Sequence, residues 1–267
     1  MISKINNQVL IIAIYFVWLF FLYLLYLNLG SFNLDLLHEE YGVALGGDSG
    51  RYIRAAQQIL LTNFPNYPEG IADINNAQGY MGYNLFLSLM FLLNLNFFSI
   101  SIVQVIISAI AGFCIFKIGS LLWNEEIGII SLIMFLFYPS IQIFNFYILT
   151  ESLFINFIII GFYILIRNYR FSTIILGALF LCYTASIRPF GVIILPLIFI
   201  YLYMVALKFK KIKIIYFLTS LFILILIFTF LVIDQLVILL GVPELLLSGD
   251  IIWNYNSMKP PYDLNSL

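Results

Sequence analysis

Seven apolar runs of membrane-spanning length dominate this sequence and limit what it can fold into. Crossing the hydrocarbon core of a bilayer takes about 20 mostly apolar residues in a helix. The runs cover residues 8–30, 99–121, 127–145, 150–166, 171–187, 190–207 and 214–233. Only 9% of all residues are charged, whereas an ordinary soluble domain has about 25%. We therefore expect an integral membrane protein.

Each run is expected to form a helix. Lipid offers the backbone no hydrogen-bond partners, so a spanning segment is either a helix or a strand of a closed barrel. The runs lack the ten-residue alternation of barrel strands. The expected fold class is all-α, a polytopic transmembrane helical protein with about seven spans. Residues 1–233 would form the transmembrane module, and residues 234–267 an extracytoplasmic C-terminal tail.

Basic residues predict the orientation, because Lys and Arg collect at the cytoplasmic ends of spans. With the N-terminus in the cytoplasm, eight of the twelve basic residues lie on that side. They are Lys4, Lys117, Arg167, Arg170, Lys208, Lys210, Lys211 and Lys213. The first run is too long for the apolar core of a signal peptide and is expected to be a retained anchor. The prediction is a multi-pass protein of the cell membrane.

Residues 79–98 could form either an eighth span or a helix in the membrane interface. Their apolar core is short and is interrupted by Asn84, Ser88, Asn94 and Asn96. We favour the interfacial helix. The orientation with seven spans then places the preceding loop outside the cytoplasm.

This first outer loop, residues 31–98, holds six acids and is the chemical part of the chain. Its segment Gly47-Asp48-Ser49-Gly50-Arg51-Tyr52 opens a stretch with helical periodicity. The apolar positions are Tyr52, Ala55, Ala56, Ile59 and Leu60, while Arg51, Arg54, Gln57 and Gln58 face elsewhere. This pattern predicts an amphipathic helix along the membrane surface.

Three charged residues on the outer side each have a structural and a functional interpretation. Asp48 suits a helix N-cap, and Glu151 suits the first turn of a span, near the positive end of the helix dipole. Arg188 suits a side chain that snorkels to the interface. The expected topology brings all three to one side at similar depth. A carboxylate can deprotonate a hydroxyl and a guanidinium can hold phosphate oxygens, so the set suits transfer from a lipid phosphate.

Four motifs in this order resemble the GT-C superfamily of membrane glycosyltransferases, particularly its branch of protein O-mannosyltransferases and lipid A aminoarabinose transferases. They are the loop motif at 47–52, the helix at 79–93, the junction Tyr138-Pro139-Ser140 with Leu149-Thr150-Glu151-Ser152-Leu153-Phe154, and the turn Ser186-Ile187-Arg188-Pro189-Phe190-Gly191. Many relatives show two adjacent acids in the loop motif, whereas here Asp48 is followed by Ser49. They also run longer, so this chain would be a short or truncated member.

The resemblance implies an inverting transfer of a sugar from a polyprenyl-phosphate donor to a hydroxyl on the extracytoplasmic face. The acceptor would be a glycan, a lipid or a protein. Asp48 is then the catalytic base, and Arg188 stabilises the departing phosphate, with Arg51 and Arg54 as alternatives.

The same resemblance leaves open a second acid or a metal site. Glu69, Asp73 and Glu151 are the candidates for either role, and their oxygens would suit Mg²⁺ or Mn²⁺. Some related enzymes work without a metal, so no cofactor is required by the resemblance.

The sequence excludes several other kinds of site and leaves two rival functions open. His38 is the only histidine, which excludes a His-rich metal centre, and Cys114 and Cys182 lie in predicted spans as packing residues. No Walker motif and no basic nucleic-acid face is present. The rival functions are a transporter or lipid flippase, and a non-catalytic subunit of a glycan-assembly complex. Transporters usually carry ionisable residues at mid-membrane, whereas here the charges gather near the ends of the spans.

Overall fold

The computed structural model describes residues 2–28, 37–38, 43–45, 48–61, 80–168 and 171–188, together with positions 191, 194, 196–197 and 200–201. All of them belong to one unit, Met1–Val205. The predicted span 190–207 is described at only a few positions. The predicted span 214–233 and the tail 234–267 lie outside the described residues.

The described chain is helical apart from one short two-stranded ladder. The elements in order are α1 (Ile2–Leu27), β1 (Leu37–His38), β2 (Val43–Ala44), α2 (Ser49–Leu61), α4 (Met81–Leu92), α5 (Phe97–Leu122), α6 (Glu125–Leu136), α7 (Pro139–Gln142), the 3₁₀ helix η3 (Ile143–Phe146), α8 (Thr150–Ile166) and α9 (Phe171–Ala185). β1 and β2 are antiparallel, with Leu37 opposite Ala44 and His38 opposite Val43.

The helices confirm a helical, membrane-associated protein. Within the described residues, two helices are long and apolar enough to cross a membrane, Asn7–Leu27 and Phe97–Leu122. The bent pair Glu125–Leu136 and Pro139–Phe146 makes a third if it counts as one span. The helices α4, α8 and α9 are apolar but shorter.

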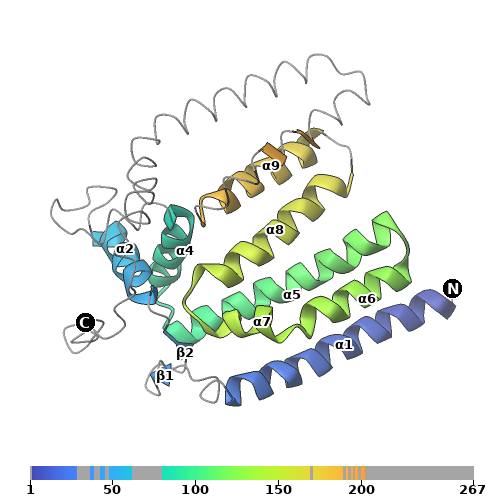
Figure 1. The fold of residues 1–267 in the computed structure, drawn as a ribbon, viewed down its shortest axis with the longest axis horizontal. Coiled ribbons are helices and arrows are strands. Elements are labelled where there is room, and N and C mark those ends of the chain that lie inside the picture. Colours follow the sequence, from blue (N-terminus) through green and yellow to red (C-terminus); the bar gives the residue numbers. More distant parts are fainter. Residues whose placement is uncertain are drawn as a thin grey trace, which may run out of the picture. The chain divides into compact units, whose positions relative to one another are not determined.

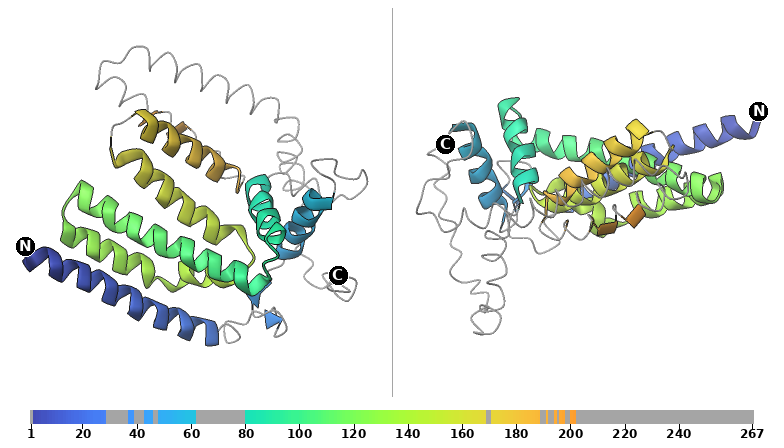
Figure 2. Two further views of the ribbon diagram at one scale, coloured as in Figure 1. Left: turned by 180° about the vertical axis from the view of Figure 1, so that it is seen from behind. Right: turned by 90° about the horizontal axis from the view of Figure 1, so that it is seen from above.

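The long helices lie side by side, in the order α1, α6, α5, α8 and α9 across the bundle, and each runs opposite to the one before it in the chain (Figure 1, Figure 2). α1 ends, α5 and α8 begin and α9 ends at one end of this bundle, which we call the loop end. α2 and α4 pack against each other there. At the opposite end, the side-chain amide of Asn7 donates to the Glu125 carboxylate over 2.6 Å, which joins α1 to α6.

The predicted span 127–145 differs from a single straight helix, because it bends by 59° between α6 and α7. Pro139 is the first residue of α7, and Tyr138 before it has an extended backbone. Proline lacks the N–H that would continue the helix, and it disfavours helical geometry at the residue before it. The bend leaves carbonyls at the end of α6 in need of donors, and the Gln142 side chain donates to that of Phe135 over 3.0 Å.

A buried polar cluster holds this bend against its neighbours. The side-chain oxygen of Gln142 accepts from Trp18 of α1 (3.2 Å), from Ser108 of α5 (3.2 Å) and from Asn145 (3.0 Å). Gln104 of α5 donates to the carbonyl of Asn145 over 3.2 Å. Backbone that departs from helical hydrogen bonding within an apolar bundle requires such partners, because its surroundings supply none.

The boundary between α4 and α5 is formed by the asparagines that interrupt residues 79–98. Asn94 has a positive φ of 55°, and the side chain of Asn96 caps α5 by accepting from the N–H of Ser99 over 2.8 Å. α4 therefore has only 12 residues, or about 18 Å at 1.5 Å per residue. That is well short of the ~30 Å hydrocarbon core, which supports the interfacial interpretation of this segment.

Candidate active site at the loop end

Asp48 stands directly before α2, where its backbone begins the helix. Its carbonyl accepts hydrogen bonds from the N–H groups of Arg51 (3.0 Å) and Tyr52 (3.3 Å). Its carboxylate pairs with the Arg51 guanidinium, with Nη1 and Oδ1 3.4 Å apart. The side chain is 47% exposed. Asp48 thus has the position of a capping residue and a carboxylate that solvent or a substrate can reach.

Ser49 anchors this carboxylate to the bundle. Its side chain is fully buried, and its hydroxyl donates to the backbone carbonyl of Ile148 over 2.9 Å. The segment before it is attached at the same place, because Ala44 of β2 bridges to Tyr147 and accepts from the N–H of Ile148 over 3.4 Å. The start of α2 is therefore held against the junction that leads into α8.

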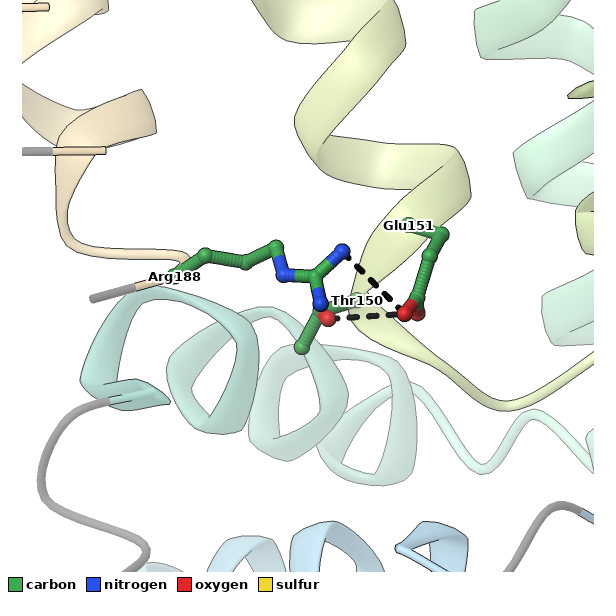
Figure 3. Close-up of polar contacts among 3 residues, drawn as sticks. All are labelled: Thr150, Glu151 and Arg188. Atoms are coloured by element: carbon green, nitrogen blue, oxygen red, sulfur yellow. Dashed lines mark hydrogen bonds and ion pairs between the residues drawn. The ribbon is translucent and has the colours of Figure 1, made fainter. Parts of the chain in front are cut away.

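Glu151 and Arg188 form the second ion pair of the site (Figure 3). Arg188 extends from the turn after α9, and its Nη1 lies 3.1 Å from Oε1 of Glu151 in the first turn of α8. The hydroxyl of Thr150 donates to the other carboxylate oxygen over 3.3 Å. The side chains are 29% and 23% exposed for Arg188 and Glu151. The pair is half-buried, so a ligand in solution can still reach both side chains.

The buried hydroxyl of Tyr52 senses both acids of the site. Burial raises the pKa of Tyr52 far above its usual value, and the charges of Asp48 and Glu151 raise it further, after a larger contribution from Tyr80. Asp48 and Glu151, which are distant in the chain, therefore both disfavour ionisation of this hydroxyl.

Three tyrosine rings, those of Tyr52, Tyr80 and Tyr83, pack together at this site. The Tyr52 ring lies 5.1 Å from that of Tyr80 and meets that of Tyr83 edge to face at 5.2 Å, centroid to centroid. Burial, followed by Tyr52 and Glu151, raises the pKa of Tyr83 well above its usual value. The side chains of Tyr52 and Tyr83 therefore stay neutral at physiological pH and add no charge to the site.

The amphipathic character predicted for residues 52–60 agrees with most of α2. The side chains of Tyr52, Ala55, Ala56 and Ile59 are buried against the bundle and α4, and that of Arg54 is exposed. Leu60, the last of the predicted apolar positions, is exposed.

The structure brings Asp48, Arg51, Glu151 and Arg188 to the loop end, so they lie at one end of the bundle. That this end faces out of the cell stays a prediction. Arg54 is on the exposed side of α2, where its Nε donates back to the Gly50 carbonyl over 3.3 Å. The remaining candidates, Glu69 and Asp73, lie outside the described residues.

The described residues do not supply a set of ligands for the predicted metal. No group of three or more His, Cys, Asp or Glu side chains suited to a metal occurs among the residues that the structure describes. The Glu151 carboxylate already contacts Arg188 and Thr150. A metal site on Glu69 and Asp73 stays a prediction, and the chemistry below uses none. Cys114 and Cys182 are free thiols.

Sequence reasoning missed two features that shape this site. The first is Ser49, whose buried contact with Ile148 has no local signal in the sequence. The second is the polar cluster at the bend, which did have one. Ser101, Gln104 and Ser108 recur at intervals of three and four along α5 and therefore form one polar face of a helix.

The chain was also compared with known proteins. It matches no protein-family model, no curated protein and no solved structure.

Proposed function

We propose that this protein is a glycosyltransferase that transfers a sugar from a polyprenyl-phosphate donor to an acceptor hydroxyl, with inversion, at the extracytoplasmic face of the cell membrane. In this proposal the chain crosses the membrane about seven times with its N-terminus in the cytoplasm. The observation that carries the proposal is the hydrogen bond from Ser49 to Ile148, which attaches the segment of Asp48 to the start of α8, where Glu151 pairs with Arg188.

The proposed reaction assigns one role to each charged group. Asp48 takes the proton of the acceptor hydroxyl as its oxygen attacks the anomeric carbon of the donor sugar. The bond from that carbon to the phosphate oxygen breaks, and the polyprenyl phosphate leaves with the bonding electrons. Arg188 stabilises the charge on the leaving phosphate, because it is a fixed cation with several N–H donors.

The ion pair of Arg188 supports this assignment. A single contact joins Nη1 to Glu151, and a guanidinium carries five N–H donors. A monodentate contact with Glu151 therefore leaves other donors of Arg188 for a phosphate. Arg51 is a weaker candidate, since its contact is with Asp48 itself.

A transporter or lipid flippase is the second candidate, and the bend at Pro139 favours it. Transporters often place discontinuous helices with polar side chains at their substrate site. The cluster around Gln142, however, consists of amides, hydroxyls and one indole, and its polar groups largely bond one another. An ion-coupled transporter needs an ionisable residue at this depth, and none is part of this cluster. A non-catalytic subunit remains the third interpretation.

The test uses the full-length protein in nanodiscs, incubated with radiolabelled polyprenyl-phosphate hexoses and an envelope extract that supplies acceptors. Asp48→Asn should lower the rate of transfer at least about 100-fold, the usual contribution of a general base. Glu125→Gln is the matched control, since it makes the same change at the opposite end of the bundle and should keep full activity. Normal transfer by Asp48→Asn would remove Asp48 from the reaction, and no transfer by the wild-type protein would favour the rivals.

A further inference from the structure

The helix α4 is hydrogen-bonded to the end of α9 and to the turn that carries Arg188. The N–H of Gly82, in the first turn of α4, donates to the carbonyl of Ser186 over 2.9 Å. The hydroxyl of Tyr183, near the end of α9, donates to the carbonyl of Gly82 over 2.8 Å. Both backbone polar groups of one residue are therefore bonded to the end of another helix. We call these two bonds the Gly82 clasp.

Helix-end chemistry explains why the clasp forms. The first four N–H groups of a helix have no partner within it, and Gly82 lies in that part of α4. α9 ends at Ala185, so the carbonyl of Ser186 also lies outside the helical ladder. The contact brings the positive end of the α4 dipole to the negative end of the α9 dipole, which is the favourable arrangement.

The clasp also requires a glycine at position 82. A Cβ atom there would collide with the hydroxyl oxygen of Ser186 and would lie 3.0 Å from the backbone nitrogen of Ile187. The Ile187 side chain is fully buried in the cluster that contains Tyr83 and Leu87 of α4. Arg188 is the next residue, so its backbone position follows from how closely α4 approaches.

The same helix holds the Asp48 side of the site. Ser88 of α4 donates to the carbonyl of Ala56 in α2 over 3.0 Å, and Tyr83 packs on Tyr52. α4 thus contacts α2, which Asp48 precedes, and the turn that carries Arg188.

We propose that α4 is a positioning element and that Gly82 and Tyr183 are positioning residues, which set Arg188 at its working distance from Asp48 through the clasp. The inference rests on the proposed function for the role of Arg188, while the clasp itself is a matter of geometry. Neither residue touches the reacting atoms. Their removal shifts Arg188, and a shift of about 1 Å at a reacting site can cost about 100-fold in rate.

The geometry is tested first, without any activity. Gly82→Ala is introduced, and its melting temperature is measured in detergent. It should melt at a lower temperature than the wild-type protein, although alanine is the better helix former, because its Cβ atom would lie 3.0 Å from the backbone nitrogen of Ile187. Ser172→Ala, at the exposed start of α9, is the control and should melt like the wild-type protein. A Gly82→Ala protein as stable as the wild type would overturn the clasp whatever the function is.

The positioning role is tested by a double-mutant cycle on binding of decaprenyl phosphate. Tyr183→Phe should weaken binding at least 10-fold in the wild-type background and have no effect in Arg188→Ala, because its influence passes through Arg188. Tyr15→Phe is the matched control. It removes a hydroxyl-to-carbonyl bond of the same length, 2.8 Å to Ala109, and should leave phosphate binding unchanged.

The outcomes separate the two proposals. If the wild-type protein binds decaprenyl phosphate and Tyr183→Phe binds it equally well, the positioning role is overturned and the proposed function stands. Equal effects of Tyr183→Phe in both backgrounds would mean a general structural role and would also overturn it. No binding by the wild-type protein, with Gly82→Ala destabilised, would count against the proposed function and would remove the positioning role with it, leaving only the clasp.

Discussion

The hydroxyl of Ser49 donates a hydrogen bond of 2.9 Å to the backbone carbonyl of Ile148, near the start of α8. This contact attaches the residue after Asp48 to the segment that leads into Glu151. It also limits which side chains position 49 accepts. A carboxylate at position 49 would be buried against a carbonyl oxygen, with no proton to donate.

Substitutions of Ser49 test this contact. Ser49→Ala should lower the free energy of unfolding by about 1–3 kcal/mol, because a buried carbonyl loses its donor. Ser49→Asp should be much worse and yield little folded protein, because it buries a charge without a partner. Thermal unfolding of the detergent-solubilised variants measures both. A Ser49→Asp protein as stable as the wild type would show that position 49 is not held as described.

The Glu151–Arg188 pair has a structural and a binding component, which a charge swap separates. Each single reversal, Glu151→Arg or Arg188→Glu, places like charges 3.1 Å apart and should lower the melting temperature. The double variant restores the pair and should recover most of that loss. It should still bind decaprenyl phosphate at least about 100-fold more weakly, because a carboxylate then stands where the proposed mechanism needs a guanidinium for the phosphate.

The measurement combines melting temperature with phosphate binding for the three variants. Recovery of both properties in the double variant would mean that Arg188 serves the fold alone. Arg188→Lys completes the series, since it keeps the charge but loses the planar fork of donors, and it should bind with intermediate affinity.

The polar cluster at the bend should matter for stability more than for catalysis. Gln142→Leu removes the acceptor of Trp18, Ser108 and Asn145 and the donor to Phe135. Each buried polar group left without a partner costs about 1–3 kcal/mol. We expect a large fall in the melting temperature, measured by tryptophan fluorescence.

An exposed glutamine provides the control for that change. Gln8→Leu, near the start of α1, alters the same chemical group at an exposed position and should leave the melting temperature nearly unchanged. An equal and small effect of Gln142→Leu and Gln8→Leu would contradict the role of the cluster in holding the bend.

The proposed orientation is tested by thiol labelling of intact cells. Arg54 is exposed at the loop end, and Trp123 is 70% exposed at the opposite end of the bundle. With Cys114 and Cys182 replaced by Ser, a membrane-impermeant maleimide should label Arg54→Cys from outside. Trp123→Cys should react only after the cells are permeabilised. The reverse pattern would place Asp48 in the cytoplasm and rule out the extracytoplasmic reaction.

The sequence by itself determined the class of the protein and the residue types of its site. Long apolar runs with few charges predict spanning helices because lipid leaves the backbone no other partners. The helical spacing of Tyr52, Ala55 and Ala56 correctly predicts the buried face of α2, and the asparagines at 94 and 96 mark the boundary between α4 and α5. These are local patterns, and local backbone chemistry decides them.

Only the tertiary structure decided which of these residues meet. Glu151 pairs with Arg188, Ser49 with Ile148 and Gly82 with Ser186, and each pair joins segments that are distant along the chain. Such contacts depend on how whole helices pack, and no spacing within one segment reports the distance to another. For the same reason Pro139 accounts locally for the bend after α6, while the side chains that stabilise the bend come from α1, α5 and the bent segment itself.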